Sequence, residues 1–190
     1  REDNPRLVEA VLRIQRGTIF DQNDTILAET TGTNGDDQLF RAYAPISNPA
    51  VGYYSFKHGT SGVEQSMDAF LRGDDNDTSQ WLRELLHNPQ IGGDVRLSID
   101  DTLQAQTEVA LGAQTGAILL LDLNQDSAQI VAMSSHPTYD PNRLDDEFDQ
   151  LTAADDAPLL NRATQGQYQP GMVLQPFLIA AALDEGLITL

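Results

Sequence analysis

Cysteine is absent from the 190 residues, which excludes disulfide bonds, thiolate chemistry and zinc–thiolate sites. Long apolar runs are absent too: none approaches the roughly 18 residues that cross a bilayer, and no signal peptide is visible. Basic residues are scarce, 11 against 29 acidic ones, and the net charge of −18 disfavours nucleic acid and anionic membrane surfaces as partners. With 40% hydrophobic residues, the chain can still bury a core as one domain or two small ones.

Lysine and histidine are also rare. Lys57 is the only lysine, so the other ten of the 11 basic residues are arginines, and Lys57-His58-Gly59-Thr60 is interpreted as an ordinary turn. His58, His87 and His136 are scattered and do not fall at metal-ligand spacing. We therefore expect no metal site and no cofactor.

Two groups of polar residues resemble catalytic arrangements. Ser134-Ser135-His136 looks like a hydrolase pair, but adjacent residues of an extended segment project to opposite sides, so a strand end before Pro137 is the better interpretation. The carboxylate pairs Asp145-Asp146 and Asp155-Asp156 could serve acid/base chemistry or bind calcium. With 29 acidic residues such pairs arise from composition, so we interpret them as a solvated surface.

Short strands and capped helices alternate in the first half of the chain. Residues 16–28 predict a hairpin around a central Asp-Gln-Asn-Asp turn. Ser61 and Glu64 have the spacing of a capping box, in which each side chain bonds the backbone N–H of the other residue. One amphipathic helix over 63–71 follows and is expected to end at Gly73.

A domain boundary is placed at Gly92-Gly93. Residues 94–100 alternate as a strand, and Asp101-Thr102-Leu103-Gln104 is expected to cap the helix that follows. The apolar runs 117–121 and 128–133 predict an antiparallel hairpin with both faces largely covered. The remaining predictions are a helix around 81–86, an acidic surface helix or loop over 145–156, and a last helix over 174–185 with Pro176 in its first turn.

Residues 168–177, Tyr-Gln-Pro-Gly-Met-Val-Leu-Gln-Pro-Phe, are the most informative part of the chain because of what they lack. They resemble the segment that opens the catalytic helix of a serine transpeptidase, Pro-Gly-Ser-x-x-Lys, where serine is the nucleophile and lysine the base. Met172 stands at the serine position and Gln175 at the lysine position. A thioether has no proton to lose, and a carboxamide takes up no proton near neutral pH.

Five segments in the same order resemble one family, the class B penicillin-binding proteins, which cross-link peptidoglycan. The short spacing between the first two segments is similar to the compact Gram-positive and actinobacterial members. The segments are Arg16-Gly17-Thr18-Ile19…Asp21, Gly52-Tyr53-Tyr54-Ser55…Gly59-Thr60-Ser61-Gly62-Val63-Glu64, Asp94-Val95…Leu97-Ser98-Ile99-Asp100…Leu103-Gln104, Gly116-Ala117-Ile118-Leu119-Leu120 leading to residues 132–142, and Asn161-Arg162-Ala163 ahead of Tyr168-x-Pro170-Gly171. Together they cover nearly the whole chain.

The resemblance implies an α+β fold in two parts: a pedestal, or dimerisation-type, domain at residues 1–93 and the start of a transpeptidase domain at residues 94–190. The second part is expected to be truncated, because the family's Ser-x-Asn and Lys-Thr-Gly segments follow the nucleophile in chain order. Residues 57–60 precede it and are not that element. Arg16 and Arg162 lie in family segments, and we expect either buried ion pairs between the two domains or surface positions.

Because nucleophile and base are both replaced, we predict that this chain is not an enzyme, although the family activity would be a serine-type D,D-transpeptidase. We expect no catalytic residue, with Met172 and Gln175 marking the degenerate positions. The predicted function is a non-catalytic penicillin-binding-protein-like component of peptidoglycan and cell-wall synthesis that acts by binding or scaffolding. Two alternatives stay open: a fragment of an active penicillin-binding D,D-transpeptidase, or an exported protein-interaction module outside wall synthesis.

The family also implies partners and a location. We expect cell-wall synthesis proteins of the cell-shape or cell-division machinery, or peptidoglycan precursors, as partners, with a homodimer as a further option and no nucleic acid. The location is expected to be extracytoplasmic, with the parent protein anchored to the bacterial membrane by an N-terminal helix outside these residues.

Overall fold

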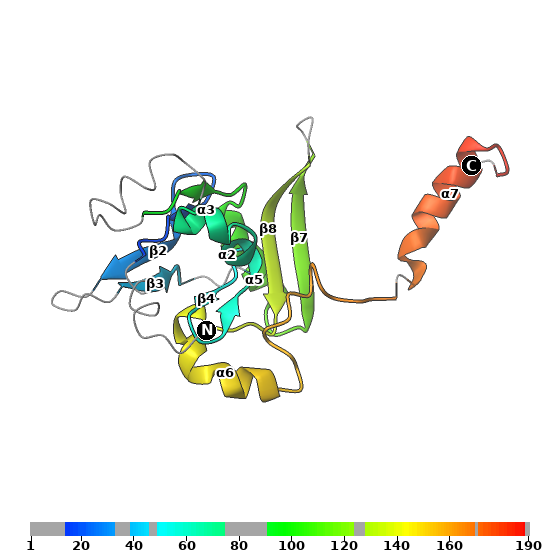
Figure 1. The fold of residues 1–190 in the computed structure, drawn as a ribbon. Helices are drawn as coiled ribbons and strands as arrows, with labels where there is room; N and C mark the ends of the chain where they lie inside the picture. The colour runs from blue at the N-terminus through cyan, green and yellow to red at the C-terminus, as the bar shows by residue number, and fades with distance from the viewer. Residues whose placement is uncertain are drawn as a thin grey trace.

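A computed structural model describes residues 14–32, 39–45, 49–74, 91–123, 128–169 and 171–188. Strands and helices are mixed along the chain, so the predicted α+β class is confirmed. A first body holds a small sheet with short helices, a two-stranded hairpin lies beside it, and one helix near the C-terminus stands apart (Figure 1). The helix predicted around 81–86 lies outside the described residues.

The first sheet has four strands in the order β3-β2-β1-β6. The predicted hairpin is confirmed: β1 (Ile19–Phe20) and β2 (Ile26–Gly32) are antiparallel, and β3 (Leu39–Tyr43) continues the meander. The strand predicted over 94–100 is shorter, since only β6 (Val95–Arg96) pairs, parallel to β1. Although β6 follows the glycine pair, it completes the sheet that β1 begins.

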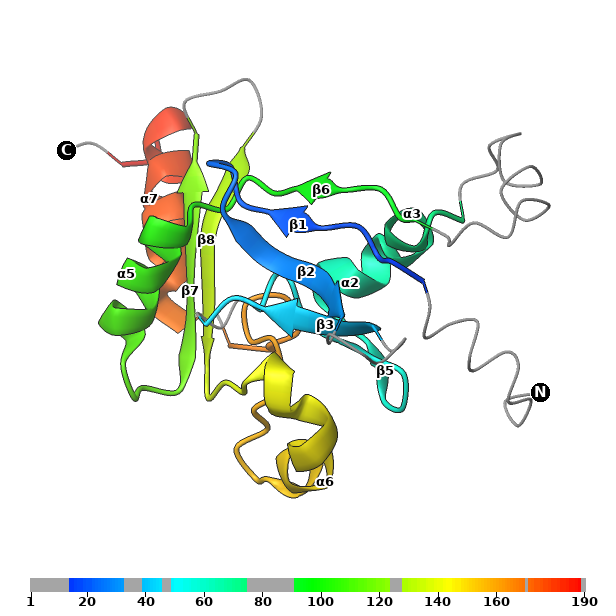
Figure 2. The same cartoon turned by 90° about the vertical axis from the view of Figure 1, so that its left-hand side faces the viewer.

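Two short helices pack beside this sheet (Figure 2). A single helix over 63–71 was the expectation, whereas the chain forms α2 (Gly62–Ser66) and α3 (Asp68–Arg72). The break falls at Met67, whose φ of −109° and ψ of 18° are not helical. The predicted end is confirmed, because Gly73 adopts the left-handed conformation with φ 74°. Buried apolar residues between sheet and helices form the core: Ile19, Leu27, Ala28, Val51 and Leu71.

The turn predicted at 57–60 is confirmed for Lys57 and His58 only, because Gly59 and Thr60 form a strand. The turn joins β4 (Tyr54–Ser55) to β5 (Gly59–Thr60), which are antiparallel. The Ser55 hydroxyl accepts the backbone N–H groups of Lys57 and His58 at 3.1 and 3.0 Å. The turn is therefore closed by a side chain of its own strand.

The glycine pair at 92–93 is a close crossing of three chain segments. The N–H of Gly92 donates to the Gln15 carbonyl at 2.8 Å, and that of Gly93 to the Phe70 carbonyl at 3.0 Å. A Cβ on Gly92 would lie 1.7 Å from the Leu71 carbonyl oxygen. Only glycine fits here, and these hydrogen bonds hold the pair to the segment before β1 and to α3. The division into 1–93 and 94–190 stays a prediction.

Gly92→Ala should therefore lower the free energy of unfolding by about 3 kcal/mol or more, because backbone atoms must move to relieve the clash. Urea denaturation measures the change. Gly116→Ala is the matched control: nothing lies within 4 Å of a Cβ built there, so its effect should stay within about 0.5 kcal/mol. Equal effects for the two variants would contradict the close crossing.

The second half begins with α5 (Asp101–Leu111) packed against the hairpin of β7 (Gly116–Asp122) and β8 (Gln129–His136). The antiparallel hairpin confirms the prediction. The helix cap is Asp100 rather than Asp101, since the Asp100 carboxylate accepts the Leu103 N–H at 3.1 Å. That bond holds the pKa of the Asp100 carboxyl below its ordinary value.

The expectation that both faces of this hairpin are largely covered is wrong for β7. Leu119 and Leu121 are about half exposed, whereas residues 131–135 of β8 are buried. Among the described elements α5 covers the hairpin mainly along β8, so the leucines of β7 stay open. Periodicity cannot show this difference, because it reports which residues are apolar and not what lies over them.

Two further helices follow the hairpin, each preceded by a 3₁₀ turn. A 3₁₀ turn, η1 (Pro141–Arg143), leads into the acidic surface helix α6 (Leu144–Ala153), as predicted. A second 3₁₀ turn, η2 (Gly171–Leu174), leads into α7 (Gln175–Asp184), with proline in its first turn as expected. Figure 1 shows α7 at the end of an extended segment, away from the other elements. No helix in the described parts of the chain has the length and apolar character to cross a membrane.

Candidate functional site

Residues 171–175, which the sequence predicts to correspond to the Gly-Ser-x-x-Lys part of the frame, lie at the junction of η2 and α7. Gly171 opens η2 with a φ of 52°, Met172 follows it, and Gln175 is the first residue of α7. Residues three apart in a 3₁₀ helix stand one above the other. Met172 and Gln175 therefore occupy one face, as the predicted register requires of a nucleophile and its base.

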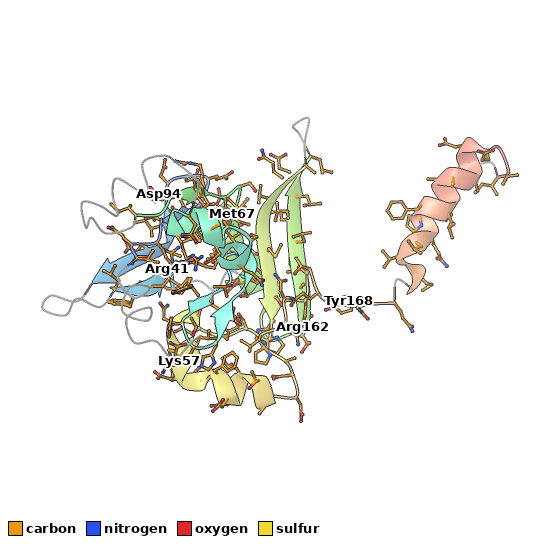
Figure 3. The ribbon with its side chains drawn as sticks, viewed as in Figure 1. Arg41, Lys57, Met67, Asp94, Arg162 and Tyr168 are labelled. Atoms are coloured by element: carbon orange, nitrogen blue, oxygen red, sulfur yellow. The ribbon has the colours of Figure 1, made fainter. Side chains whose placement is uncertain are left out.

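This junction is open to solvent. Met172 is 75% exposed, and no described residue of η2 or α7 is buried. Tyr168 lies on the extended segment that leads to α7 (Figure 3). Within the described residues, no hydrogen bond or ion pair involves the side chain of Met172 or Gln175. The two positions share one helix face, and both lie in a helical segment without buried residues in the described part of the chain.

The chemistry of the two side chains follows from their atoms. Nucleophilic catalysis at this position needs a hydroxyl and a neighbouring base that removes its proton. The Met172 sulfur carries no proton, and the Gln175 carboxamide is neutral. The described residues contain no group of three histidine, cysteine, aspartate or glutamate side chains that could hold a metal ion.

A buried ionic network is the most strongly organised group of side chains in the described residues. Glu64 in α2 is fully buried. Its carboxylate accepts from Arg16 Nη2 at 2.8 Å and from Arg41 Nε at 2.6 Å, and Arg16 Nη1 also reaches Asp68 at 2.7 Å. We call these four residues the Glu64 network; Figure 3 shows Arg41 among the side chains of the first body.

The Glu64 network corrects two predictions. Glu64 was expected to complete a capping box with Ser61, but Ser61 makes no cap hydrogen bond, and its hydroxyl accepts the Tyr53 N–H at 3.2 Å instead. The Glu64 carboxylate is drawn inward because two buried guanidinium groups need a counter-charge. Arg16 does form a buried ion pair, yet within the first body and not between the two predicted domains.

Tyr43 and Tyr54 enclose this network. The Arg16 guanidinium lies 4.2 Å from the centre of the Tyr54 ring, and the Tyr43 hydroxyl lies 3.5 Å from the Glu64 carboxylate. Burial, together with the Glu64 charge, raises the pKa of the Tyr43 phenol well above its ordinary value. Burial acts to lower the pKa of Arg16, but Glu64 and Asp68 outweigh it and raise that pKa. Both groups thus keep their protons at any physiological pH.

Gln104 of α5 is a second buried polar residue. Its amide donates to the Met133 carbonyl at 2.7 Å and accepts the Met133 N–H at 2.9 Å, so it pairs with β8 as a neighbouring strand would. Thr107 reaches the Ser134 hydroxyl at 2.7 Å on the same side. These bonds explain why α5 lies along β8.

Ser134 and Ser135 project to opposite sides, as predicted for a strand end. The Ser135 hydroxyl donates to the Leu160 carbonyl at 3.2 Å and accepts the Arg162 N–H at 3.1 Å. Arg162 is buried, but it makes no ion pair in the described structure, and its guanidinium donates to the carbonyls of Asp156, Ala157 and Leu160. The predicted inter-domain ion pair of Arg162 is therefore wrong: this arginine satisfies backbone carbonyls of a loop.

A junction joins the first body to η1 and α6. The Asn142 amide accepts the Tyr43 N–H at 2.9 Å and donates to the Tyr43 carbonyl at 3.2 Å. The Ser55 hydroxyl donates to the Asp145 carboxylate. His58 stacks on Phe148, with ring centres 3.7 Å apart. Asp145 thus has a specific role that its acidic neighbourhood in the sequence did not indicate.

A cavity of about 90 Å³ lies beside this junction, lined among others by Ser61, Ser135, Tyr139 and Asn161. Burial raises the pKa of Tyr139 to about 12, so its phenol is a neutral wall of the cavity.

Sequence reasoning missed Glu64, Arg41, Gln104 and Asn142 as organising residues. Glu64 and Gln104 lie in segments that carried the family resemblance, and each is a polar residue on an otherwise core-facing helix side. Such a residue signals a buried partner when two elements pack there. Periodicity alone could not name the partner.

Two family models match the chain. Residues 16–95 match the penicillin binding protein A dimerisation domain, and residues 116–190 match the penicillin binding protein transpeptidase domain. Among curated proteins, the peptidoglycan D,D-transpeptidase MrdA of Escherichia coli K12 is 32% identical over 143 residues, which cover 72% of this chain and 21% of that protein. The peptidoglycan D,D-transpeptidase PbpA of Mycolicibacterium smegmatis is 31% identical over 192 residues, which cover 90% of this chain and 38% of that protein.

Solved structures give the same result. The imipenem acyl-enzyme complex of penicillin-binding protein A from Mycobacterium tuberculosis has a TM-score of 0.80 at 27% identity and covers 94% of this chain and 44% of that one. The D,D-transpeptidase domain of a peptidoglycan glycosyltransferase from Eggerthella lenta has a TM-score of 0.75 at 28% identity, over 93% of this chain and 38% of that one. The chain therefore spans less than half the length of these relatives.

The predicted family is confirmed by both halves of the chain. The first sheet and the helices α2 and α3 lie in the dimerisation match. The hairpin β7–β8 and the helix α7 lie in the transpeptidase match, and α5 lies just before it. The chain belongs to the class B penicillin-binding proteins, with their dimerisation domain and the first part of their transpeptidase domain.

Proposed function

We propose that this chain is a non-catalytic component of peptidoglycan synthesis that acts by binding or scaffolding. One observation carries the proposal: Met172 and Gln175 stand where the family's Pro-Gly-Ser-x-x-Lys frame has its nucleophile and base. The relatives MrdA and PbpA are named peptidoglycan D,D-transpeptidases, which supports a role in the same process.

The chemistry explains why the replacement matters. Acylation forms a bond between the serine oxygen and a carbonyl carbon, while the serine proton passes to the base and the leaving group takes up a proton in turn. Met172 offers no such proton, and Gln175 cannot accept one. Losing the nucleophile of a hydrolytic triad costs roughly 10⁶-fold in kcat, so positioning alone would leave no useful turnover.

Without catalysis, the chain would act through its folded surface, and its first body is held together by buried contacts. The Glu64 network and the glycine crossing hold α2, α3 and the first sheet together. We propose cell-wall synthesis proteins or peptidoglycan precursors as partners, a second copy of the chain as a further option, and an extracytoplasmic location on a membrane-anchored parent. The net charge of −18 supports protein or glycopeptide partners over nucleic acid.

A fragment of an active D,D-transpeptidase is the second candidate. Two observations favour it: the relatives MrdA and PbpA are named D,D-transpeptidases, and the similar structure of penicillin-binding protein A from M. tuberculosis is an imipenem acyl-enzyme complex. If the chain is a fragment of an active transpeptidase, residues 170–175 would not be the acylation site of the parent protein.

Imipenem labelling tests the proposal. This chain, incubated with imipenem, should keep its unmodified mass in intact-protein mass spectrometry, because no Ser-x-x-Lys occurs in it. Penicillin-binding protein A of M. tuberculosis, which forms an imipenem acyl-enzyme, is the positive control. A parent protein that also carries the Ser-x-Asn and Lys-Thr-Gly segments should stay unlabelled as well. A stoichiometric adduct on any serine of that parent would favour the second candidate.

A further inference from the structure

Tyr43 belongs to two separate hydrogen-bonded assemblies. It is the last residue of β3, and its side chain points to the Glu64 network while its backbone faces η1. The register of β3 explains the arrangement: Ala44 bonds back to Leu27 of β2, so the N–H and carbonyl of Tyr43 turn away from β2.

The side-chain end is buried. The Tyr43 hydroxyl accepts the Tyr54 N–H at 2.6 Å and lies 3.5 Å from the Glu64 carboxylate. That carboxylate is held by Arg16 and Arg41. The Tyr43 ring of β3 is therefore held in one position by its contacts with Tyr54 of β4 and Glu64 of α2.

The backbone of Tyr43 is bound by Asn142, whose side-chain amide accepts the Tyr43 N–H and donates to the Tyr43 carbonyl. Asp145, one helical turn further, accepts from Ser55, the neighbour of Tyr54 in β4. The η1–α6 turn therefore holds β3 at Tyr43 and β4 at Ser55, the residue next to Tyr54, whose N–H the Tyr43 hydroxyl accepts.

We propose that Tyr43 is a positioning residue that couples the Glu64 network of the dimerisation domain to the η1–α6 turn of the transpeptidase part. The bonds of the Tyr43 backbone to Asn142 and the bond of the Tyr43 hydroxyl to the Tyr54 N–H both depend on the position of β3. Weakening the bonds to Asn142 therefore weakens the Tyr43–Tyr54 hydrogen bond, and weakening the Tyr43–Tyr54 bond weakens the bonds to Asn142. Such coupling is reciprocal by thermodynamic necessity. This inference is independent of the proposed function, because it concerns how one half of the chain responds to the other, whether or not the protein is catalytic.

Amide hydrogen exchange on the 190-residue chain tests the coupling. Asn142→Ala should speed exchange of the Tyr43 N–H, which loses its acceptor, and also that of the Tyr54 N–H, which Asn142 does not touch. We expect about a fivefold acceleration at Tyr54, the effect of one net hydrogen bond. In the converse experiment, Tyr43→Phe should speed exchange at residue 43 by a similar factor, although its bond to Asn142 is intact.

Asn161→Ala is the matched control. It removes another hydrogen bond between the two halves, from the Asn161 amide to the Pro49 carbonyl at 3.2 Å, without touching Tyr43. Exchange at Tyr54 should stay unchanged in this variant. The proposal is overturned if Asn142→Ala accelerates Tyr43 alone, if it accelerates neither amide, or if Asn161→Ala accelerates Tyr54 as strongly.

Discussion

Glu64→Gln should lower the free energy of unfolding by about 3–5 kcal/mol, the cost of leaving buried charges without their partner. The side chains of Arg16 and Arg41 are both buried, and both form ion pairs with the Glu64 carboxylate. An amide can accept from one guanidinium, but its NH₂ group then faces the donors of the other. Arg41 Nη2 already has no hydrogen-bond partner among the described residues, so the site has no spare acceptor. Urea denaturation followed by circular dichroism measures the loss.

Glu147→Gln is the matched control for this variant. Glu147 pairs with Arg143 four residues earlier, but that arginine is 67% exposed. Exposed pairs of this kind contribute about 0.3–0.5 kcal/mol. A Glu64 variant that loses no more than the Glu147 variant would show that the buried carboxylate is replaceable, and the account of the network would be wrong.

Met172→Ser combined with Gln175→Lys should restore acylation by a β-lactam, in a protein that also carries the Ser-x-Asn and Lys-Thr-Gly segments. Positions 172 and 175 share one face across the η2–α7 junction, so a lysine amine there lies close enough to take the serine proton. The gain could approach the roughly 10⁶-fold that a nucleophile contributes. A gel assay with a fluorescent β-lactam measures the label.

Each single change serves as a control for the double change. Met172→Ser alone leaves a serine without a base, and Gln175→Lys alone leaves a base without a nucleophile, so neither should be labelled. Circular dichroism must first show that the double variant folds. A folded variant that stays unlabelled would contradict the prediction: either the groove has changed at more than these two residues, or Met172 does not stand at the nucleophile position.

Local patterns predicted most of the elements. The β1–β2 hairpin, the β7–β8 hairpin, the acidic helix α6 and the end of α3 at Gly73 follow from turn residues and periodicity. The break at Met67 and the two-residue length of β6 did not, because both depend on what the segment packs against. The Asp100 cap was missed by one residue, a usual uncertainty at helix ends.

Polar residues were the main source of error, since their roles depend on partners far away in the chain. Glu64 was read as a local cap and is the counter-charge of arginines 48 and 23 residues earlier. Arg162 was expected either to form an inter-domain ion pair or to lie at the surface, and instead it is buried and donates to the carbonyls of its own loop. Nothing in the spacing of Gln104 indicates that its amide pairs with Met133.

The sequence by itself determined the family, and it carries the prediction that positions 172 and 175 replace the nucleophile and the base. Both depend on which residue types stand at fixed local spacings in the sequence, and they need no tertiary contact. Only the tertiary structure decided where charge is buried and how the two halves meet, at Tyr43 and Asn142. The physical reason is range: turns and caps are set within a few residues, whereas a buried ion pair forms only where folding brings its partners out of water together.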